Sequence, residues 1–560
     1  MILKSILHKL IQDKILIFLT FVFFLVLLIK CVAFIKYTGF YNFPLNSYKT
    51  MGVWGMYFGV CGFFASFVLI TKWKWWIVIL SLILDIWLVG NLLYWRSYND
   101  LLSVFSLEDA GNLTQFWTSI FLFFEWKDIL FLLLTIILIL VMIYLPNKKQ
   151  INIFLFFLSL SCSILLTYPQ VRSMKIFRGY NLFSAEYITN SYLPNIYHCI
   201  SFTPINYLIL QISGIKAFVS EKKPAIDINE INPFLQKSND TETEKKYNLI
   251  LVIFESLETW VINSEINNQQ ITPNINKLYS GQNVLFADKV TDQTKHGKSM
   301  DGQMIINTGL LPIYKGATSN RYFKNFFFSL AKAYPKHTKS SFIGNNGECW
   351  NEIQTTINFG YDTLFTNLES DYSICKIATE KICDKPYIFQ IVTTASHSPF
   401  KDFPDSSSLI TPNNMPAEMA RYIKTINYTD KTLGILLEKA DLDNTIIMIT
   451  GDHIIFYDQK RELFKNYCKN NEINIPVEKK FTPLIIYSPE FEKRIIVTDT
   501  VYQMDIYPTL LHLLHRENYI WKGFGINLSD PNAKRKITPD DAQKLSDAII
   551  RNDYFKNIEF

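Results

Sequence analysis

The sequence has no basic tract, no interleaving of aromatic and basic residues, and no internal repeat. Its net charge of +5 is small for 560 residues, so we do not expect it to bind nucleic acid. Eight cysteines are too few for a disulfide-built scaffold, although Cys375 and Cys383 lie close enough in sequence to leave one bridge open. Charge is also sparse before about residue 170, where Leu, Ile, Phe and Trp predominate. The remainder has the composition of a soluble domain.

Five apolar runs in the first part reach or approach the length of about 18 residues that suggests a membrane span. Asp85 lies inside the third run, where a carboxylate should face the helix bundle and not lipid. Serines dilute the fifth run, so a buried helical hairpin is the alternative there. The first run is not expected to be a cleavable signal, because Lys30 interrupts its end and no small-residue cleavage site follows. The runs are residues 15–35, 51–70, 75–95, 129–145 and 151–168.

The placement of lysine in the short loops predicts the orientation. Lysines precede the first run and lie between the second and third runs and between the fourth and fifth, which assigns these segments to the cytoplasm. With five spans, everything after about residue 170 then lies outside. We therefore expect a multi-pass protein of the plasma (inner) membrane with a cytoplasmic N-terminus and an extracytoplasmic catalytic domain.

From residue 247 onward, apolar runs of strand length alternate with helical patterns, which is typical of an α/β sheet with mainly parallel strands. The expected strands are 249–254, 340–343, 388–393, 446–449 and 484–487, with helices over 418–439, 502–514 and 538–552. We predict four parts. These are a five-helix transmembrane domain (1–170), a membrane-surface connector with an amphipathic helix over 205–215 (171–245), a catalytic α/β domain (246–530) and a charged helical tail (531–560).

Three of these strands run into polar residues suited to metal or phosphate chemistry. Glu255 ends the first, His397 follows another, and Asp452 and His453 follow a third. Ligands bind at the carboxyl ends of strands in open α/β sheets, so these side chains should gather there. A carboxylate beside an imidazole supplies ligands for a divalent cation. Taken singly, each has an ordinary alternative, such as a first-turn acid or a satisfied histidine.

Ser299 lies in the polar loop 295–299 and is a candidate nucleophile. Its hydroxyl needs activation by a base, a metal or a positive charge, and Lys298 offers a charge. A surface-loop serine is the alternative. The Gly-Lys-Ser ending is not a Walker phosphate loop, because Asp292 stands in place of that pattern's first glycine and no strand is evident before the loop. Together, these residues indicate a hydrolase or transferase of phosphate or sulfate esters.

Several motifs occur in a fixed order along the second half of the chain. They are Phe-Glu-Ser-Leu-Glu (254–258), Gln-Thr-x-x-Gly-Lys-Ser-x-Asp (293–301), Trp350, Ser-His-x-Pro-Phe (396–400) and Gly-Asp-His (451–453). With them, the chain resembles the lipoteichoic acid synthase-like family, the phosphoglycerol transferase branch of the alkaline phosphatase/sulfatase superfamily. The resemblance covers nearly the whole chain. It implies an alkaline phosphatase/sulfatase-like catalytic domain.

The resemblance also implies a chemistry. One divalent ion, expected to be manganese with magnesium or zinc as alternatives, would be held by Glu255, Ser299, Asp452 and His453. Ser299 would attack the head-group phosphodiester of a phospholipid donor, and a covalent serine intermediate would pass the head group, expected to be phosphoglycerol, to an envelope glycan or glycolipid. Lys298, His397, Trp350 and Asn345 are then expected to bind substrate.

Two departures from the family pattern bear on the head group. Relatives carry His-Gly-Asp ahead of the tryptophan and an arginine two positions after it, whereas this chain has Ile-Gly-Asn at 343–345 and Glu352. An acid in place of a phosphate-binding cation makes a phosphoethanolamine transferase the alternative, unless Glu352 simply faces solvent. A sulfatase is not expected, because the segment after Ser299 lacks the Pro and Arg of the formylglycine sequence. A silent membrane sensor is a more distant alternative.

Overall fold

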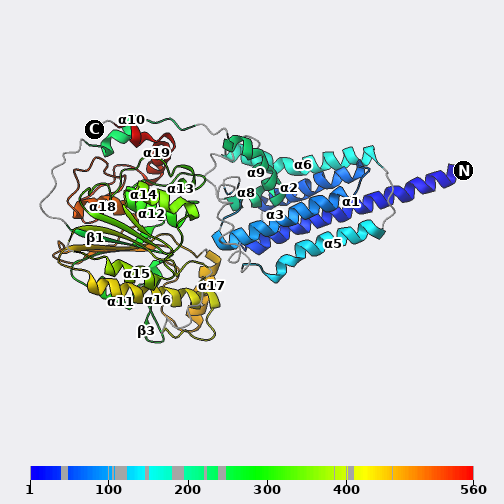
Figure 1. Cartoon of the computed structure of the whole chain (residues 1–560). Helices are drawn as coiled ribbons and strands as arrows, with labels where there is room; N and C mark the ends of the chain where they lie inside the picture. Colours follow the sequence, from blue (N-terminus) through cyan, green and yellow to red (C-terminus); the bar gives the residue numbers. More distant parts are fainter. Residues whose placement is uncertain are drawn as a thin grey trace. The chain divides into compact units, whose positions relative to one another are not determined.

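The structure, a computed structural model, describes residues 2–39, 48–98, 100–103, 106, 123–144, 151–178, 195–219, 223–236, 247–383, 385–398, 400, 409–456 and 458–558. The chain forms two compact units, Met1–Glu221 and Lys222–Phe560 (Figure 1). The expected start of the catalytic domain, at residue 246, lies outside the described residues. The limits of the four expected parts therefore stay predictions.

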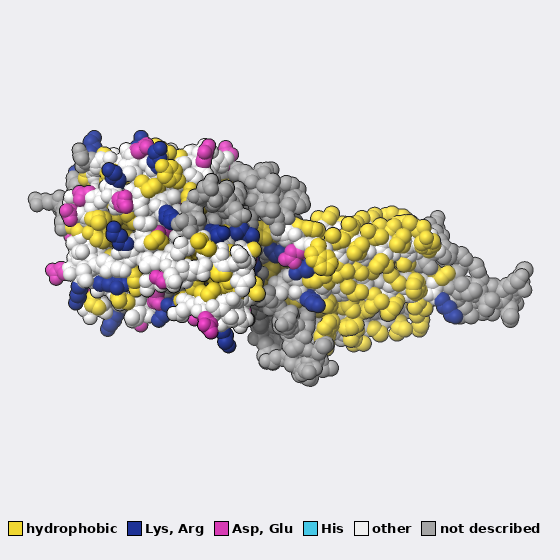
Figure 2. Space-filling model, turned by 90° about the horizontal axis from the view of Figure 1, so that it is seen from below, with side chains coloured by type: hydrophobic (Ala, Val, Ile, Leu, Met, Phe, Trp, Pro, Cys, Tyr) yellow, Lys and Arg dark blue, Asp and Glu magenta, His cyan; other side chains and the backbone are white. Residues whose placement is uncertain are grey.

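Five long apolar helices build the first unit, which confirms the five expected spans. Hydrophobic side chains dominate the face of this unit that Figure 2 shows. The segments long and apolar enough to cross a membrane are Lys14–Thr38, Gly52–Leu69, Trp76–Ser97, Trp126–Tyr144 and Ile153–Arg172. The helices are α1 (Ile2–Thr38), α2 (Tyr48–Ser66), α3 (Trp76–Tyr98), α5 (Ile129–Tyr144) and α6 (Ile153–Arg178).

The last of these helices departs from expectation. α6 is continuous from Ile153 to Arg178 with Pro169 inside it, so a helical hairpin over 151–168 is wrong, and the proline does not end the helix. α6 packs closely on α2, where a Cβ added to Gly59 would stand 2.6 Å from the carbonyl oxygen of Ser163. Small residues at such a contact let two helix backbones approach, which is how helices associate in lipid.

Asp85 faces the inside of the bundle, as expected, and pairs with Lys30. Both side chains are buried, and the Lys30 ammonium also donates to the hydroxyls of Ser81 at 2.6 Å and Thr135 at 2.7 Å. Thr135 in turn donates to Asp85 at 2.6 Å. The cluster joins α1, α3 and α5. A charge at this depth is stable only when it is paired and hydrogen-bonded, as here.

Two shorter helices follow the bundle in the chain, α8 (Asn195–Phe202) and α9 (Pro204–Val219). α9 includes the expected helix over 205–215. Its Tyr207 is buried and donates a hydrogen bond to the carbonyl of Leu102 at 2.9 Å, while Ile209 and Ile212 are exposed. The helix therefore packs on the first unit through one side. Its place on a membrane surface stays a prediction.

A nine-stranded sheet forms the centre of the second unit, in the order β10-β4-β9-β8-β1-β7-β5-β6 with β11 beside β4. All neighbours are parallel except β9, which runs antiparallel to both β4 and β8. The mainly parallel sheet is thus confirmed. The strands are β1 (Asn248–Phe254), β4 (Val284–Thr291), β5 (Thr338–Ile343), β6 (Thr363–Phe365), β7 (Tyr387–Val392), β8 (Thr445–Gly451), β9 (Thr482–Tyr487), β10 (Ile495–Val497) and β11 (Val501–Tyr502).

Helices cover both faces of the sheet (Figure 1). Along β1, Leu249, Leu251 and Ile253 belong to the core on one face, and Ile250 and Val252 belong to the core on the other, as a strand buried on both sides requires. One face carries α12 (Ser299–Thr308), α14 (Glu352–Asn358), α18 (Ile506–Leu513) and α19 (Pro539–Asn552). The other carries α11 (Pro273–Tyr279), α15 (Asp371–Glu380), α16 (Ala417–Lys439) and α17 (Asp458–Asn470).

The expectation that no strand precedes the 295–299 loop is wrong. β4 ends at Thr291, and the loop follows it directly. Asp288 and Lys289 interrupt the apolar run of this strand and hide it in the sequence. In the structure, Asp288 pairs with Lys479 at 3.0 Å, so the acid is accommodated by a contact distant in the chain.

The structure shows how the C-terminal tail packs and whether Cys375 and Cys383 form a disulfide. On α19, Ala542, Leu545 and Ile549 are part of the same core as β1, so this segment is packed and not peripheral. Cys375 is buried and Cys383 is exposed, and both are free thiols. The bridge that the sequence left open is absent from this structure.

Candidate metal and nucleophile site

Three neighbouring strands carry the candidate residues to one edge of the sheet. Glu255 follows β1, Asp452 and His453 follow β8, and His397 lies five residues beyond β7. β1 pairs in parallel with both β7 and β8, so all three carboxyl ends point the same way. The polar side chains gather there because the topology brings these strand ends together.

The side chains of Glu255, Asp452 and His453 converge on a common point. Their ligand atoms lie within 4.8 Å of one another, and all three residues are buried. The Nε2 atom of His453 is 3.5 Å from Oε1 of Glu255 and 3.7 Å from Oδ2 of Asp452. The hydroxyl of Ser299 donates to Oε2 of Glu255 at 2.9 Å and lies 3.4 Å from Nε2 of His453. Ser299 is partly exposed, so a substrate can reach it.

The electrostatics of this group suit a cation. Burial and the nearby carboxylate of Asp452 raise the pKa of Glu255. Burial lowers the pKa of His453, but the carboxylates of Asp452 and Glu255 raise it by more, and the net shift is upward. Two acids held together out of water retain protons unless a positive charge joins them. Two carboxylates, an imidazole and a hydroxyl are a donor set that fits one divalent cation.

Backbone contacts fix the acidic ligands in place. The Oδ1 atom of Asp452 accepts hydrogen bonds from the backbone N–H of Ser256 at 2.6 Å and of His453 at 2.7 Å. The carbonyl of Glu255 accepts from the hydroxyl of Ser396 at 2.6 Å. These bonds leave the second oxygen of Asp452 turned toward His453. The strand ends thus hold one another in register.

The loop over residues 295–299, called here the nucleophile loop after its candidate nucleophile Ser299, is held in place by the carboxylate of Asp301. Ser299 is the first residue of α12, and Lys298 before it has a φ of +45°, a conformation that costs energy in a residue with a side chain. Asp301 is buried, and its Oδ2 atom accepts from the backbone N–H groups of Lys295 and Gly297, both at 2.9 Å. Burial raises the pKa of Asp301 to about 6, and these two bonds oppose that shift. Asp301 is therefore the anchor of the turn that presents Ser299.

Asp301→Ala is expected to lower kcat by at least about tenfold and the stability by about 2–4 kcal/mol. It removes two hydrogen bonds to a buried carboxylate, each of which contributes about 1.5–3 kcal/mol, and the burial cost of that carboxylate, which is removed with it, offsets part of the loss. It also releases a loop in which a shift of about 1 Å matters. Steady-state kinetics and thermal melts would measure both effects. Asp301→Asn keeps one acceptor oxygen, so its kcat and its stability should lie between those of the wild type and those of Asp301→Ala. Equal activity of all three proteins would show that the loop holds its shape without this side chain.

Two further contacts tie the site to distant parts of the chain. Gln293 and Gln503 bond to each other's backbone, with the side chain of each accepting from an N–H of the other's segment. Gln503 also donates to the carbonyl of Asp452 at 2.6 Å. Glu258 is fully buried, pairs with Arg461 at 2.7 Å and accepts from two backbone N–H groups just after His453. The sequence motifs contained Gln293 and Glu258, and Gln503 lies in an expected helix, but the roles of all three depend on contacts that only the fold creates.

Gly451 is required by the close approach of β8 to the loop after β1. A Cβ at this position would stand 2.1 Å from the carbonyl oxygen of Leu257, which is backbone and cannot move alone. Gly451→Ala is therefore expected to destabilise the domain by more than about 3 kcal/mol and to displace the adjacent Asp452. Chemical denaturation would measure the loss. A melting curve that matches the wild type would contradict it.

The remaining candidates are placed less tightly. Lys298 is partly buried next to Ser299, and His397 is exposed, with Nδ1 2.7 Å from the carbonyl oxygen of Ser398. Trp350 is partly buried and its ring centroid lies 6.3 Å from that of His296, in the nucleophile loop. Asn345 is exposed and hydrogen-bonds to Glu352. Glu352 itself is buried, so the alternative that it faces solvent is wrong.

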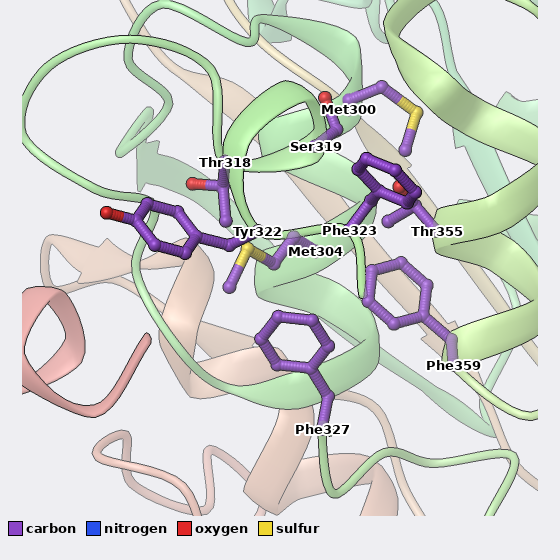
Figure 3. Close-up of a pocket in the computed structure, with 9 residues that line it drawn as sticks. All are labelled: Met300, Met304, Thr318, Ser319, Tyr322, Phe323, Phe327, Thr355 and Phe359. Atoms are coloured by element: carbon purple, nitrogen blue, oxygen red, sulfur yellow. The ribbon is translucent and has the colours of Figure 1, made fainter. Parts of the chain in front are cut away.

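Another face of α12 packs on a small apolar cavity (Figure 3). Its volume is about 10 Å³, room for about one water molecule, which is too small for a lipid chain. Ser319 presents a buried hydroxyl there without a hydrogen-bond partner among the described residues. The lining residues are Met300, Met304, Thr318, Ser319, Tyr322, Phe323, Phe327, Thr355 and Phe359.

Both halves of the chain match known domain families. The lipoteichoic acid synthase N-terminal domain matches residues 3–206, and the sulfatase domain matches residues 247–516. The chain belongs to the lipoteichoic acid synthase-like family. Like the other members of this family, the protein described here is a membrane protein and a transferase.

Two lipoteichoic acid synthases are similar in sequence to this chain over most of its length. It is 25% identical over 517 residues to the lipoteichoic acid synthase of Staphylococcus saprophyticus, covering 82% of this chain and 75% of that one. The lipoteichoic acid synthase of Staphylococcus aureus is 24% identical over 507 residues, covering 80% and 74%. The lipooligosaccharide phosphoethanolamine transferase A of Neisseria meningitidis has the same fold, with a TM-score of 0.54 and 13% identity over 90% of this chain and 95% of that one.

Proposed function

We propose that this protein takes the head group of a phospholipid, expected to be phosphoglycerol, and transfers it through Ser299 to an envelope glycan or glycolipid. The contact that carries this proposal is the 2.9 Å hydrogen bond from the Ser299 hydroxyl to Glu255, within a buried group of two carboxylates and an imidazole. A hydroxyl placed against a cation site and open to solvent is suited to attack a phosphorus atom. The lipoteichoic acid synthases among its relatives support phosphoglycerol as the group transferred.

A single divalent cation, expected to be manganese, would be held by Glu255, Asp452, His453 and Ser299. Bound there, it would favour the alkoxide form of Ser299 and draw charge from a phosphoryl oxygen. The N-terminal position of Ser299 on α12 adds to this effect, because backbone N–H groups and the helix dipole favour negative charge at that point. Lys298 lies beside the same position.

In the first half of the reaction, Ser299 Oγ forms a bond to phosphorus while the bond from phosphorus to the diacylglycerol oxygen breaks. The proton of the hydroxyl passes to Glu255, which already accepts its hydrogen bond. The leaving oxygen takes up a proton and departs as diacylglycerol. We assign His397 to this oxygen or to the phosphate, because it lies on the exposed segment after β7.

In the second half, a hydroxyl of the acceptor attacks the phosphorus of the serine ester. The bond to Ser299 breaks, the acceptor's proton passes to the group that protonated the leaving oxygen, which we assign to His397, and Ser299 regains its proton from Glu255. We propose that both halves occur outside the cytoplasm, since the lysines of the short loops place the N-terminus inside. Trp350 and Asn345 are proposed to line the side of the site that holds the head group.

The full-length protein in detergent, with manganese and phosphatidylglycerol labelled in its glycerol head group, tests the proposal. We expect release of unlabelled diacylglycerol and label bound covalently to the peptide that contains Ser299, with loss of both products on chelation. Phosphatidylethanolamine run in parallel decides whether ethanolamine is the transferred group. Label on another residue, or no diacylglycerol from either lipid, would reject the mechanism.

A further inference from the structure

A buried chain of hydrogen bonds ends on the carboxylate of Glu352. The hydroxyl of Tyr361 donates to Asn307 at 3.0 Å, Asn307 to Gln390 at 2.7 Å, Gln390 to Gln303 at 3.2 Å, and Gln303 to Glu352 at 2.7 Å. A carboxylate can only accept, and this sets the direction of every amide in the chain. Because all the bonds point the same way, each polarises the next and favours negative charge at Glu352.

No cation accompanies this charge. Glu352 is 4% exposed, and no lysine, arginine or histidine pairs with it in the described part of the chain. Burial raises the pKa of Glu352, while the bonds from Gln303 and Asn345 oppose that shift. A buried acid that is hydrogen-bonded but lacks a counter-charge has acceptor capacity left, since a carboxylate can accept about four hydrogen bonds. The bond from Asn345 is the longer one, at 3.2 Å, and Asn345 is exposed.

Glu352 is linked to the segment that carries Ser299. Gln303 follows Ser299 by one turn on α12, so these side chains share a face about 5–6 Å apart. Trp350, two residues before Glu352, contacts the nucleophile loop through His296. The side chain of Glu352 is therefore tied through Gln303 to the helix that begins with Ser299, and it lies behind an exposed asparagine that a ligand can displace.

We propose that Glu352 selects the head group by accepting a hydrogen bond from its far end. This inference rests on the proposed transfer of a head group to Ser299. A hydroxyl of glycerol and the ammonium of ethanolamine share the chemistry required, a hydrogen-bond donor. A second phosphate at this point is excluded by repulsion between like charges.

The test compares three lipids that differ only in the head group: phosphatidylglycerol, phosphatidylethanolamine and phosphatidylmethanol, whose methyl group has no donor. Diacylglycerol release gives kcat/KM for each with the full-length wild type, Glu352→Gln and the matched control Glu348→Gln, an exposed glutamate of the same loop. The wild type is expected to favour its donor lipid over phosphatidylmethanol by at least about 100-fold, since a site built to bond a polar group rejects an analogue without it. Glu352→Gln should reduce that ratio by at least about tenfold, and Glu348→Gln should leave it unchanged.

A larger loss with phosphatidylethanolamine identifies the ammonium as the ligand, and a larger loss with phosphatidylglycerol identifies the hydroxyl. Equal losses with all three lipids would overturn the proposal, because they would show a structural role for Glu352, and melting curves of the variants would then reveal the lost stability. An unchanged ratio would overturn it as well. No diacylglycerol from any lipid with the wild type would instead reject the proposed function on which the selection rests.

Discussion

Replacing Ser299 by alanine is expected to lower diacylglycerol release at least about 1,000-fold and to abolish covalent labelling of the protein. In the proposed mechanism this hydroxyl is the attacking group, and a transferase without its nucleophile retains only what binding and charge stabilisation contribute. The Ser299 hydroxyl donates to one carboxylate oxygen of Glu255 at 2.9 Å. Among the described residues, the only other hydroxyl that bonds to this carboxylate is that of Ser256, which donates to the second oxygen at 2.7 Å. Release of diacylglycerol from a lipid labelled in its head group measures the first effect, and the label that remains on the protein measures the second.

Two variants control this experiment. Ser299→Thr keeps a hydroxyl at the same place and should retain labelling. Ser319→Ala removes a buried hydroxyl that has no hydrogen-bond partner in the described structure and lines the cavity beside α12, so it should change the rate little. Undiminished turnover by Ser299→Ala would assign the attack to water or to the acceptor directly, and Ser256→Ala would then be the variant to examine.

Removal of the metal is expected to have an effect of similar size. Chelation should abolish head-group transfer, and manganese should restore it and raise the melting temperature of the protein. A ligand at 100 times its dissociation constant stabilises the folded state by about 2.7 kcal/mol, which corresponds to several degrees. Glu255→Gln should lose both the activity and the manganese-dependent rise, because it removes one carboxylate from the ligand group.

The metal-free form of the same variant provides the sharper comparison. Without a cation, burial and the neighbouring carboxylate of Asp452 disfavour the charged form of Glu255 and raise its pKa, so a charge at this position destabilises the metal-free protein. Glu255→Gln without metal should therefore melt no lower than the wild type without metal. Glu462→Gln, on the exposed side of α17, is the control and should keep the manganese response. A variant that melts lower in both states would show that Glu255 is needed for folding and not for metal binding.

Much of the fold follows from local patterns. The five spans depend on length and apolarity, and the structure has helices at all five places. Buried parallel strands such as β1 and β8 are continuous apolar runs, and those were found. β4 was missed because Asp288 interrupts the run, and its acceptance depends on Lys479, nearly two hundred residues further along. α6 continues through Pro169 beyond the expected fifth span, and its packing against α2 is likewise a contact between distant segments.

The residues of the candidate site fall into the same two groups, those that local sequence patterns indicate and those whose place only the fold reveals. Glu255, Ser299, Asp452 and His453 could be named beforehand, because polar residues at the ends of apolar strands and beside glycine in a loop are unusual enough to stand out. Glu352 could be noticed only as a charge out of place. Its burial, and the amides of Gln303 and Gln390 that point toward it, follow from the packing of α12 against the sheet.

The sequence by itself determined the five apolar helices and the α/β class, and it named four candidate residues that the structure brings together, because each of these depends on residues close together in the chain. Tertiary structure alone decided which hydrogen bonds hold Ser299 in position, that Cys375 and Cys383 stay apart, and that Glu352 is buried and bonded to Gln303 of α12. Those features depend on segments separated by tens to hundreds of residues, whose contacts exist only once the sheet has assembled.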